Sequence, residues 1–243
     1  MKNIVTLCLI VFLLLNCVGC SENYEDYTQA GNGTVYSFDI KSVISNDVNA
    51  ASQIIYPKLV GNSANLEAVN EMIMQETEMQ LKEILAEEYL NAVIKLDYTI
   101  LFENDYLICF LFEGMFLTEN SAHPTNIAFS VCLSLVEAEI LDPLTLVETD
   151  EEFFRTMREN LGINQNADRF SNEQWEIVAK YIDAYSNDEI EEIIKTDSSK
   201  TLAVQPNGVL VLLPVPHALG DYIKILVPFS WNQKGIKTGG RFA

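Results

Sequence analysis

The chain has 243 residues, and its 35 Asp and Glu outnumber its 15 Lys and Arg, giving a formal net charge of −20. Such a charge repels nucleic acid and anionic membrane surfaces, which excludes nucleic-acid binding, and it attracts cationic partners from a distance. The alternative interpretation is that the charge only keeps the protein soluble. The length of the chain is enough for one large domain or two small ones.

The first 19 residues resemble a bacterial lipoprotein signal peptide. Lys2 precedes an apolar run over residues 4–15, which is shorter than the roughly 20 residues that a membrane-spanning helix needs. Small residues at Val18 and Gly19 then precede Cys20. We expect cleavage before Cys20 and attachment of lipid, including palmitate, to this cysteine, which would anchor the protein in the cell membrane on its extracytoplasmic side. An uncleaved signal anchor is the alternative.

Residues 20–33 are polar and predict a flexible spacer. The folded domain is expected over residues 34–229, with a possible subdivision near 148–200, and residues 230–243 predict a loose tail. Alternating apolar residues predict a strand at 34–40, and a second strand at 53–56 is expected to end at Pro57. From Asn65 the apolar residues recur at helical spacing and predict an amphipathic helix of about six turns.

Three segments rich in Ile, Leu, Phe and Val, at 92–103, 106–117 and 127–136, predict an antiparallel meander. If the second hairpin is centred between Asn120 and Ser121, Cys109 faces Cys132 across the two strands. In an oxidising exterior the pair could form a disulfide, and two buried free thiols are the alternative. No CxxC or His-rich spacing accompanies them, so metal binding is not expected.

The remainder predicts helices followed by strands. The spacing of a capping box occurs three times: Thr149 with Glu152, Ser171 with Gln174, and Ser186 with Glu189. These signals predict a helix ending near residue 160 and two consecutive helices over 172–195. Strands are expected at 201–205, 208–213 and 222–229. The order of elements predicts an α+β fold with antiparallel sheets, a long amphipathic helix and a helical segment before the last strands.

Motifs for catalysis are absent from the sequence, which contains no HExxH, GxSxG, Walker or GxGxxG pattern. We therefore predict no catalytic residues, no metal and no cofactor. The two histidines lie in predicted loops: His123 with Pro124 at a hairpin tip, and His217 within a loop stiffened by Pro214 and Pro216. A stiff, exposed loop is suited to binding a partner, because preorganisation lowers the entropic cost. Both loops could equally be simple turns.

At these segments the chain resembles the extracytoplasmic domain family of RsiV, a lysozyme-sensing anti-sigma factor, and of PdaC-type peptidoglycan deacetylases. The landmarks, over residues 34–229, are the segment 56–59 before the long helix, Ala122-His123-Pro124, the segment 133–146, and Gly208 through Pro214 to Phe229. Two departures concern the loops. Asn120-Ser121 replaces the usual Gly-Gly, and Val215 and Ala218 occupy positions where the family tends to have aromatic residues.

The resemblance implies a sensor-like module that stands alone on a lipid anchor. Its implied partner is a lysozyme-like cationic protein or peptidoglycan, bound without catalysis. The alternative from another class is an enzyme or accessory domain acting on cell-wall glycan through a pair of carboxylates, which needs only two acids across a cleft.

Overall fold

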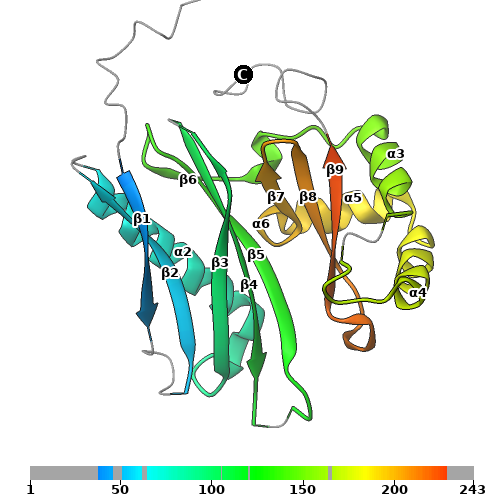
Figure 1. The fold of residues 1–243 in the computed structure, drawn as a ribbon, viewed down its shortest axis with the longest axis horizontal. Coiled ribbons are helices and arrows are strands. Elements are labelled where there is room, and N and C mark those ends of the chain that lie inside the picture. The colour runs from blue at the N-terminus through cyan, green and yellow to red at the C-terminus, as the bar shows by residue number, and fades with distance from the viewer. Residues whose placement is uncertain are drawn as a thin grey trace, which may run out of the picture. The chain divides into compact units, whose positions relative to one another are not determined.

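The structure, a computed structural model, describes residues 38–45, 51–61, 65–104, 106–119, 121–163 and 166–228, the first of these segments as backbone (Figure 1). These residues belong to one compact unit. The predicted signal peptide, Cys20, the spacer at 20–33 and the tail at 230–243 lie outside the described residues. Among the described residues, no helix has both the length and the apolar character needed to span a membrane.

The fold is α+β, as the sequence predicts, and has two sheets. The first sheet contains six strands in sequence order: β1 (Phe38–Ser45), β2 (Gln53–Gly61), β3 (Val93–Glu103), β4 (Leu107–Leu117), β5 (Thr125–Ser134) and β6 (Glu139–Leu141). The second contains three antiparallel strands: β7 (Leu202–Gln205), β8 (Gly208–Pro214) and β9 (Tyr222–Pro228).

Helices connect and cover the sheets. The α-helices are α2 (Leu66–Leu85), α3 (Glu151–Asn160), α4 (Asn172–Asp183), α5 (Asn187–Thr196) and α6 (Ser198–Thr201). Short 3-10 turns are η1 (Ala86–Glu88), η2 (Pro143–Thr145) and η3 (His217–Leu219). Helix α2 lies behind the first sheet in Figure 1, while α3 and α4 lie beside the second.

The core between α2 and the first sheet follows from the alternation of side chains along the strands and from their helical spacing along α2. Strand β4 points alternate residues toward α2, and Phe110 and Phe112 among them are fully buried. Phe112 stacks on Phe129 of β5 with ring centroids 5.2 Å apart. From α2, Val69 and Ile73 enter the same core at helical spacing. The predicted long helix and meander are therefore confirmed.

The opposite face of the first sheet packs on the second sheet. Leu111 of β4 contacts a small core with Ala203 of β7 and Leu212 of β8. A hydrogen bond reinforces this contact, because the Ser130 hydroxyl donates to the Leu202 carbonyl at 2.6 Å. Helices α3, α4 and α5 bury their apolar residues in the largest core, on the other face of the second sheet.

The register of the hairpin β4–β5 is the predicted one, since Cys109 pairs with Cys132. Their Cα atoms are 4.1 Å apart and the two sulfurs form a disulfide, one of the two alternatives that the sequence leaves open. Both cysteines are buried in the largest core. The disulfide therefore lies where the first sheet meets the rest of that core.

Strands β1 and β2 differ from the prediction. Strand β1 covers Phe38–Ser45, beyond the predicted end at residue 40, while residues 34–37 of the predicted strand lie outside the described residues. Strand β2 continues through Pro57 to Gly61. Proline is tolerated because β2 pairs with β3 only at Gln53 and Ile54, so its missing N–H interrupts no hydrogen bond to β3. That pairing is parallel, which makes the first sheet mixed, with α2 as the crossover that a parallel pair requires.

One of the three predicted helix caps is wrong. Asp150, and not Thr149, caps α3, with its side chain accepting a hydrogen bond from the Phe153 N–H at 2.9 Å. Glu152 does not reach back to the cap, because it forms an ion pair with Arg155. The capping boxes of α4 at Ser171 and of α5 at Ser186 are confirmed.

Candidate functional site

The tip of the hairpin β4–β5 exposes His123 and Pro124. A local pair of hydrogen bonds shapes the turn before them. The Ser121 N–H donates to the Thr118 carbonyl at 3.1 Å, and the hydroxyls of the same two residues are 2.7 Å apart. His123 and Pro124 are thus exposed to solvent beside a turn that the hydrogen bonds between Thr118 and Ser121 stabilise.

The second predicted loop connects β8 to β9 and is tightly closed. The Val215 N–H donates to the Asp221 carbonyl at 2.8 Å, across the base of the loop. Within it, η3 ends at Gly220, whose φ of 92° favours glycine. Pro214, Pro216 and His217 are exposed around this turn. Val215, at a position where the resembled family tends to have an aromatic residue, is buried.

Asp221 joins the two loops. One carboxylate oxygen, Oδ2, accepts hydrogen bonds from the backbone N–H of Asn126 at 2.8 Å and from its side-chain amide at 3.0 Å. The other, Oδ1, accepts a hydrogen bond from Nδ1 of His217 at 2.7 Å. Only 11% of the Asp221 side chain is exposed. One largely buried carboxylate therefore fixes the start of β5, next to the hairpin tip, against the proline-rich loop.

Arg169 also stabilises the loop between β8 and β9. Its guanidinium donates to the Tyr222 carbonyl at 2.9 Å and to the Gly220 carbonyl, and it lies 4.2 Å from the centroid of the Tyr222 ring. Because arginine presents a rigid planar fork, it holds both carbonyls at once. Arg169 therefore holds the loop between β8 and β9 in place, in addition to the contact that Asp221 makes with β5.

The Tyr222 hydroxyl belongs to a second polar cluster. It donates to Glu113 Oε1 at 2.7 Å, and the Lys224 ammonium lies 3.0 Å from the same oxygen. Burial, together with the nearby Glu113 carboxylate, raises the pKa of Tyr222 well above its usual value. Tyr222 therefore remains protonated near neutral pH and donates its hydrogen bond to Glu113, which fixes the position of its ring. A protonated hydroxyl cannot act as a base.

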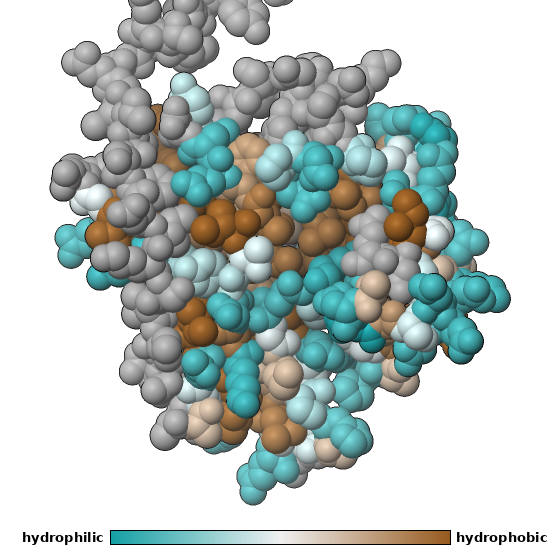
Figure 2. Space-filling view, viewed as in Figure 1, coloured by the Kyte–Doolittle hydropathy of each residue, from teal (hydrophilic) through white to brown (hydrophobic). Residues whose placement is uncertain are grey.

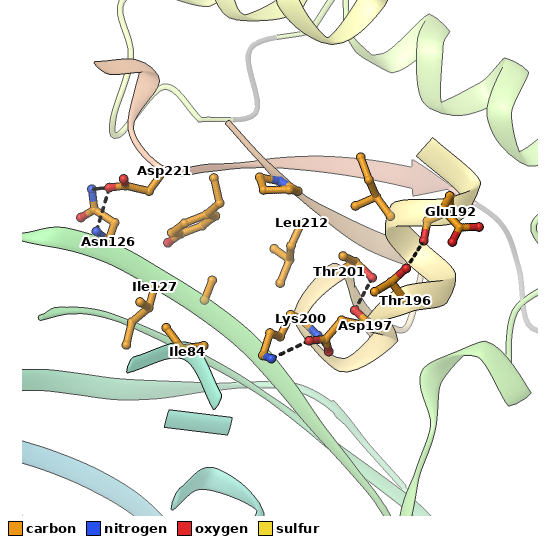
Figure 3. Close-up of a pocket in the computed structure, with 14 residues that line it drawn as sticks. Ile84, Asn126, Ile127, Glu192, Thr196, Asp197, Lys200, Thr201, Leu212 and Asp221 are labelled. Carbon is orange, nitrogen blue, oxygen red and sulfur yellow. Dashed lines mark hydrogen bonds and ion pairs between the residues drawn. The ribbon is translucent and has the colours of Figure 1, made fainter. Parts of the chain in front are cut away.

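A pocket of about 440 Å³ lies between the first sheet, the second sheet and the end of α5. We call it the inter-sheet pocket. Its walls are mainly apolar, with Ile84, Ile127, Ile193, Leu212 and Tyr222 among them. Figure 3 shows Asn126 and Asp221 at one end, Glu192 and Thr196 at the other, and Leu212 between them. Since Asp221, Asn126 and Pro214 also lie at the ends of the two loops, the pocket is continuous with the loop surface.

Other candidate chemistry is limited. No group of three or more His, Cys, Asp or Glu in the described part of the chain could hold a metal ion. On the face seen in Figure 2, the coloured hydrophobic residues are scattered over both sheets among hydrophilic ones. That face thus offers several small apolar areas. A second pocket, of about 700 Å³, lies between β2 and α2 and has polar side chains in its walls, among them Lys58, Asn70 and Glu78. The inter-sheet pocket differs from it in sharing residues with the two predicted loops.

The loop residues predicted from the sequence, His123, Pro124, Pro214, Pro216 and His217, thus lie in two segments that the contact between Asn126 and Asp221 joins. The residues that link them were not predicted. Asp221 and Asn126 are 95 positions apart, and the sequence marked neither of them. Nothing in the sequence indicated Arg169.

Replacing Asp221 by glycine is expected to separate the two loops. Glycine tolerates the positive φ of 72° at this position, so the change removes the carboxylate with little backbone strain. The Asn126 N–H and side-chain amide and the His217 Nδ1–H then lose their acceptor, which should cost about 2 kcal/mol of unfolding free energy. Urea denaturation measures this loss. Asp221→Asn, which keeps one acceptor oxygen and also tolerates positive φ, should lose less, and equal losses would contradict the assigned role of the carboxylate.

Comparisons with known proteins identify neither a family nor a function for this chain. No protein-family model matches the sequence, and no curated protein matches it. A DUF3298 family protein from Pseudomonas aeruginosa PAO1 aligns with a TM-score of 0.43 and 9% identity, over 83% of this chain and 94% of that one. A DUF3298 member from Bacteroides fragilis NCTC 9343 aligns with a TM-score of 0.43 and 12% identity, over 86% and 96%. A likeness at this level identifies no function, and the resemblance to RsiV and PdaC stays a prediction.

Proposed function

We propose that this protein is a membrane-anchored surface lipoprotein whose folded domain binds a cationic partner without catalysis. Its docking surface consists of the hairpin tip, residues 121–126, and the loop of residues 214–221. The observation that supports this proposal most directly is the carboxylate of Asp221, which holds the two segments together. A preorganised surface loses little conformational entropy on binding.

The charge of the chain supports the choice of partner. With a net charge of −20, the protein attracts cations from a distance and repels anionic polymers. Removal of the signal peptide would take away one lysine and no acid, making the remainder slightly more negative. A cationic protein of the cell wall environment, such as lysozyme, is the partner class that this field and the family resemblance both favour.

The anchor is supported by the sequence at the amino end. An apolar run too short to span the bilayer, followed by Val18-Gly19-Cys20, is the pattern of a lipoprotein signal. Lipid on Cys20, followed by a polar spacer, would place the docking surface beyond the membrane, where a cationic wall protein can reach it. Mass spectrometry of the protein extracted from membranes tests this step by showing whether Cys20 is the acylated amino terminus.

Binding to lysozyme should weaken as salt is added. Exposed charges separated by more than about 8 Å are largely screened at physiological ionic strength, so the long-range attraction fades. We expect the affinity, measured by calorimetry on the lipid-anchored protein in neutral nanodiscs, to fall roughly tenfold or more between 50 and 500 mM salt. A total absence of binding at low salt would exclude lysozyme as the partner. Turnover of peptidoglycan fragments by the purified protein would instead support the glycan-acting alternative.

A further inference from the structure

The inter-sheet pocket has a distinct distribution of charge. Carboxylates lie near both ends, with Asp221 at one and with Glu192 and Asp197 toward the other (Figure 3). Its single lysine, Lys200, is already neutralised, because its ammonium lies 2.5 Å from Asp197 and 3.1 Å from Glu83. Glu192 is exposed. The rim therefore attracts cations and disfavours an anionic ligand.

The walls between these carboxylates favour an apolar group. Leu212 and Ile127 are buried in the cores behind the pocket, and Ile84 and Ile193 are half-buried at its surface. The Tyr222 hydroxyl is directed to Glu113, so this side chain can contribute its ring to the pocket. A volume of about 440 Å³ is within the usual range for a small-ligand site and is ample for one large side chain.

We propose that the inter-sheet pocket receives a large apolar side chain of a partner protein, with Lys or Arg residues on either side of it in the partner. The apolar side chain contacts the walls formed by Ile84, Ile193 and Leu212. One flanking cation pairs with the exposed Glu192, and the other is attracted by the negative charge at the Asp221 end, where the carboxylate keeps its bonds to Asn126 and His217. This inference rests on the proposed function, because the pocket and the docking surface share Asp221 and Asn126. It adds the chemistry that the partner must present.

Short capped peptides test the proposal on the lipid-anchored protein in nanodiscs of neutral lipid. Lys-Phe-Lys is the probe, and Lys-Gly-Lys and Glu-Phe-Glu are its matched controls. We expect Lys-Phe-Lys to bind about tenfold more tightly than either control, since burial of one aromatic side chain contributes at least a factor of that size. Methyl NMR signals of Ile84, Ile127, Ile193 and Leu212 should shift on titration.

Two pairs of variants separate the pocket from general charge effects. Glu192→Lys should weaken the binding of Lys-Phe-Lys several-fold, whereas Glu176→Lys, the same change at an exposed position of α4, should not. Ile193→Lys should abolish the methyl shifts, and Ile177→Lys, at a side chain that is 61% exposed on α4, should leave them intact. Thermal unfolding of each variant shows whether it is folded.

The outcomes distinguish this inference from the proposed function. Equal binding of Lys-Phe-Lys and Lys-Gly-Lys, equal binding of Glu-Phe-Glu, or shifts that avoid the pocket methyls would each overturn the inference. If lysozyme still binds the docking surface in any of those cases, the proposed function survives alone. If lysozyme binding is also absent, the inference falls and lysozyme is excluded as the partner as well.

Discussion

Replacing Gly114 by alanine is expected to lower the free energy of unfolding by about 3 kcal/mol or more. A Cβ atom at this position of β4 would lie 2.0 Å from the Lys95 carbonyl oxygen and 2.9 Å from the Leu96 Cα. Both are backbone atoms of β3, so neither can move without disturbing the pairing of the two central strands. Urea denaturation followed by far-UV circular dichroism measures the loss.

Gly162→Ala is the matched control for this prediction. A Cβ atom there would come no closer than 3.5 Å to a neighbouring heavy atom, the Glu159 carbonyl oxygen, which is an ordinary contact. This variant should change the unfolding free energy by less than about 1 kcal/mol, in the stabilising direction, because alanine restricts the unfolded chain. Equal stabilities of the two variants would mean that β3 and β4 are not as close at Gly114 as described.

Removing the disulfide is expected to have an effect of similar size. The bond between Cys109 and Cys132 closes a loop with a sequence separation of 23. Loss of such a constraint on the unfolded chain should cost about 3 kcal/mol in the double variant Cys109→Ala, Cys132→Ala. The two residues are also buried in the largest core, so the variant keeps apolar side chains there.

Reduction provides the matched test of the same bond. A thiol reductant under unfolding conditions should lower the stability of the natural protein to near that of the double variant, and should leave the double variant unchanged. Identical unfolding curves for the natural protein with and without reductant would show that Cys109 and Cys132 are free thiols.

Local patterns in the sequence were sufficient to predict most elements of the fold. Strands β3, β4 and β5 are rich in β-branched and aromatic residues, and a single turn centred near residue 120 fixed the pairing of Cys109 with Cys132. Ser171 and Ser186 each have a partner three residues later, and both begin helices. In these cases the residues that determine the structure are near one another in the chain or related by one hairpin.

Predictions were wrong where distant pairing decides the outcome. Pro57 indicated the end of a strand, but β2 tolerates it because its pairing with β3 stops after Ile54. The parallel orientation of β2 and β3 depends on α2 crossing between them, which the sequence pattern of each element does not reveal. At Thr149-Asp150, two adjacent residues can each cap a helix, and the local sequence did not decide between them.

The candidate site shows the same division. The sequence indicated both loops, through His123-Pro124 and through the prolines around His217, because each is a local turn signal. It did not reveal that Asp221 links them, since that contact joins residues 95 positions apart. The inter-sheet pocket was also not predictable, because its walls come from α2, β5, α5, α6, β8 and β9 and exist only once the two sheets have packed together.

Hydrogen exchange on the lipid-anchored protein, with and without lysozyme, tests the central claim most directly. The amides of the hairpin tip and of the loop between β8 and β9 should become protected together, and Asp221→Gly should reduce the protection of both. Protection confined to the outer side of α2, or protection of one loop that is unaffected by the Asp221 variant, would contradict the account of a single docking surface held by this carboxylate.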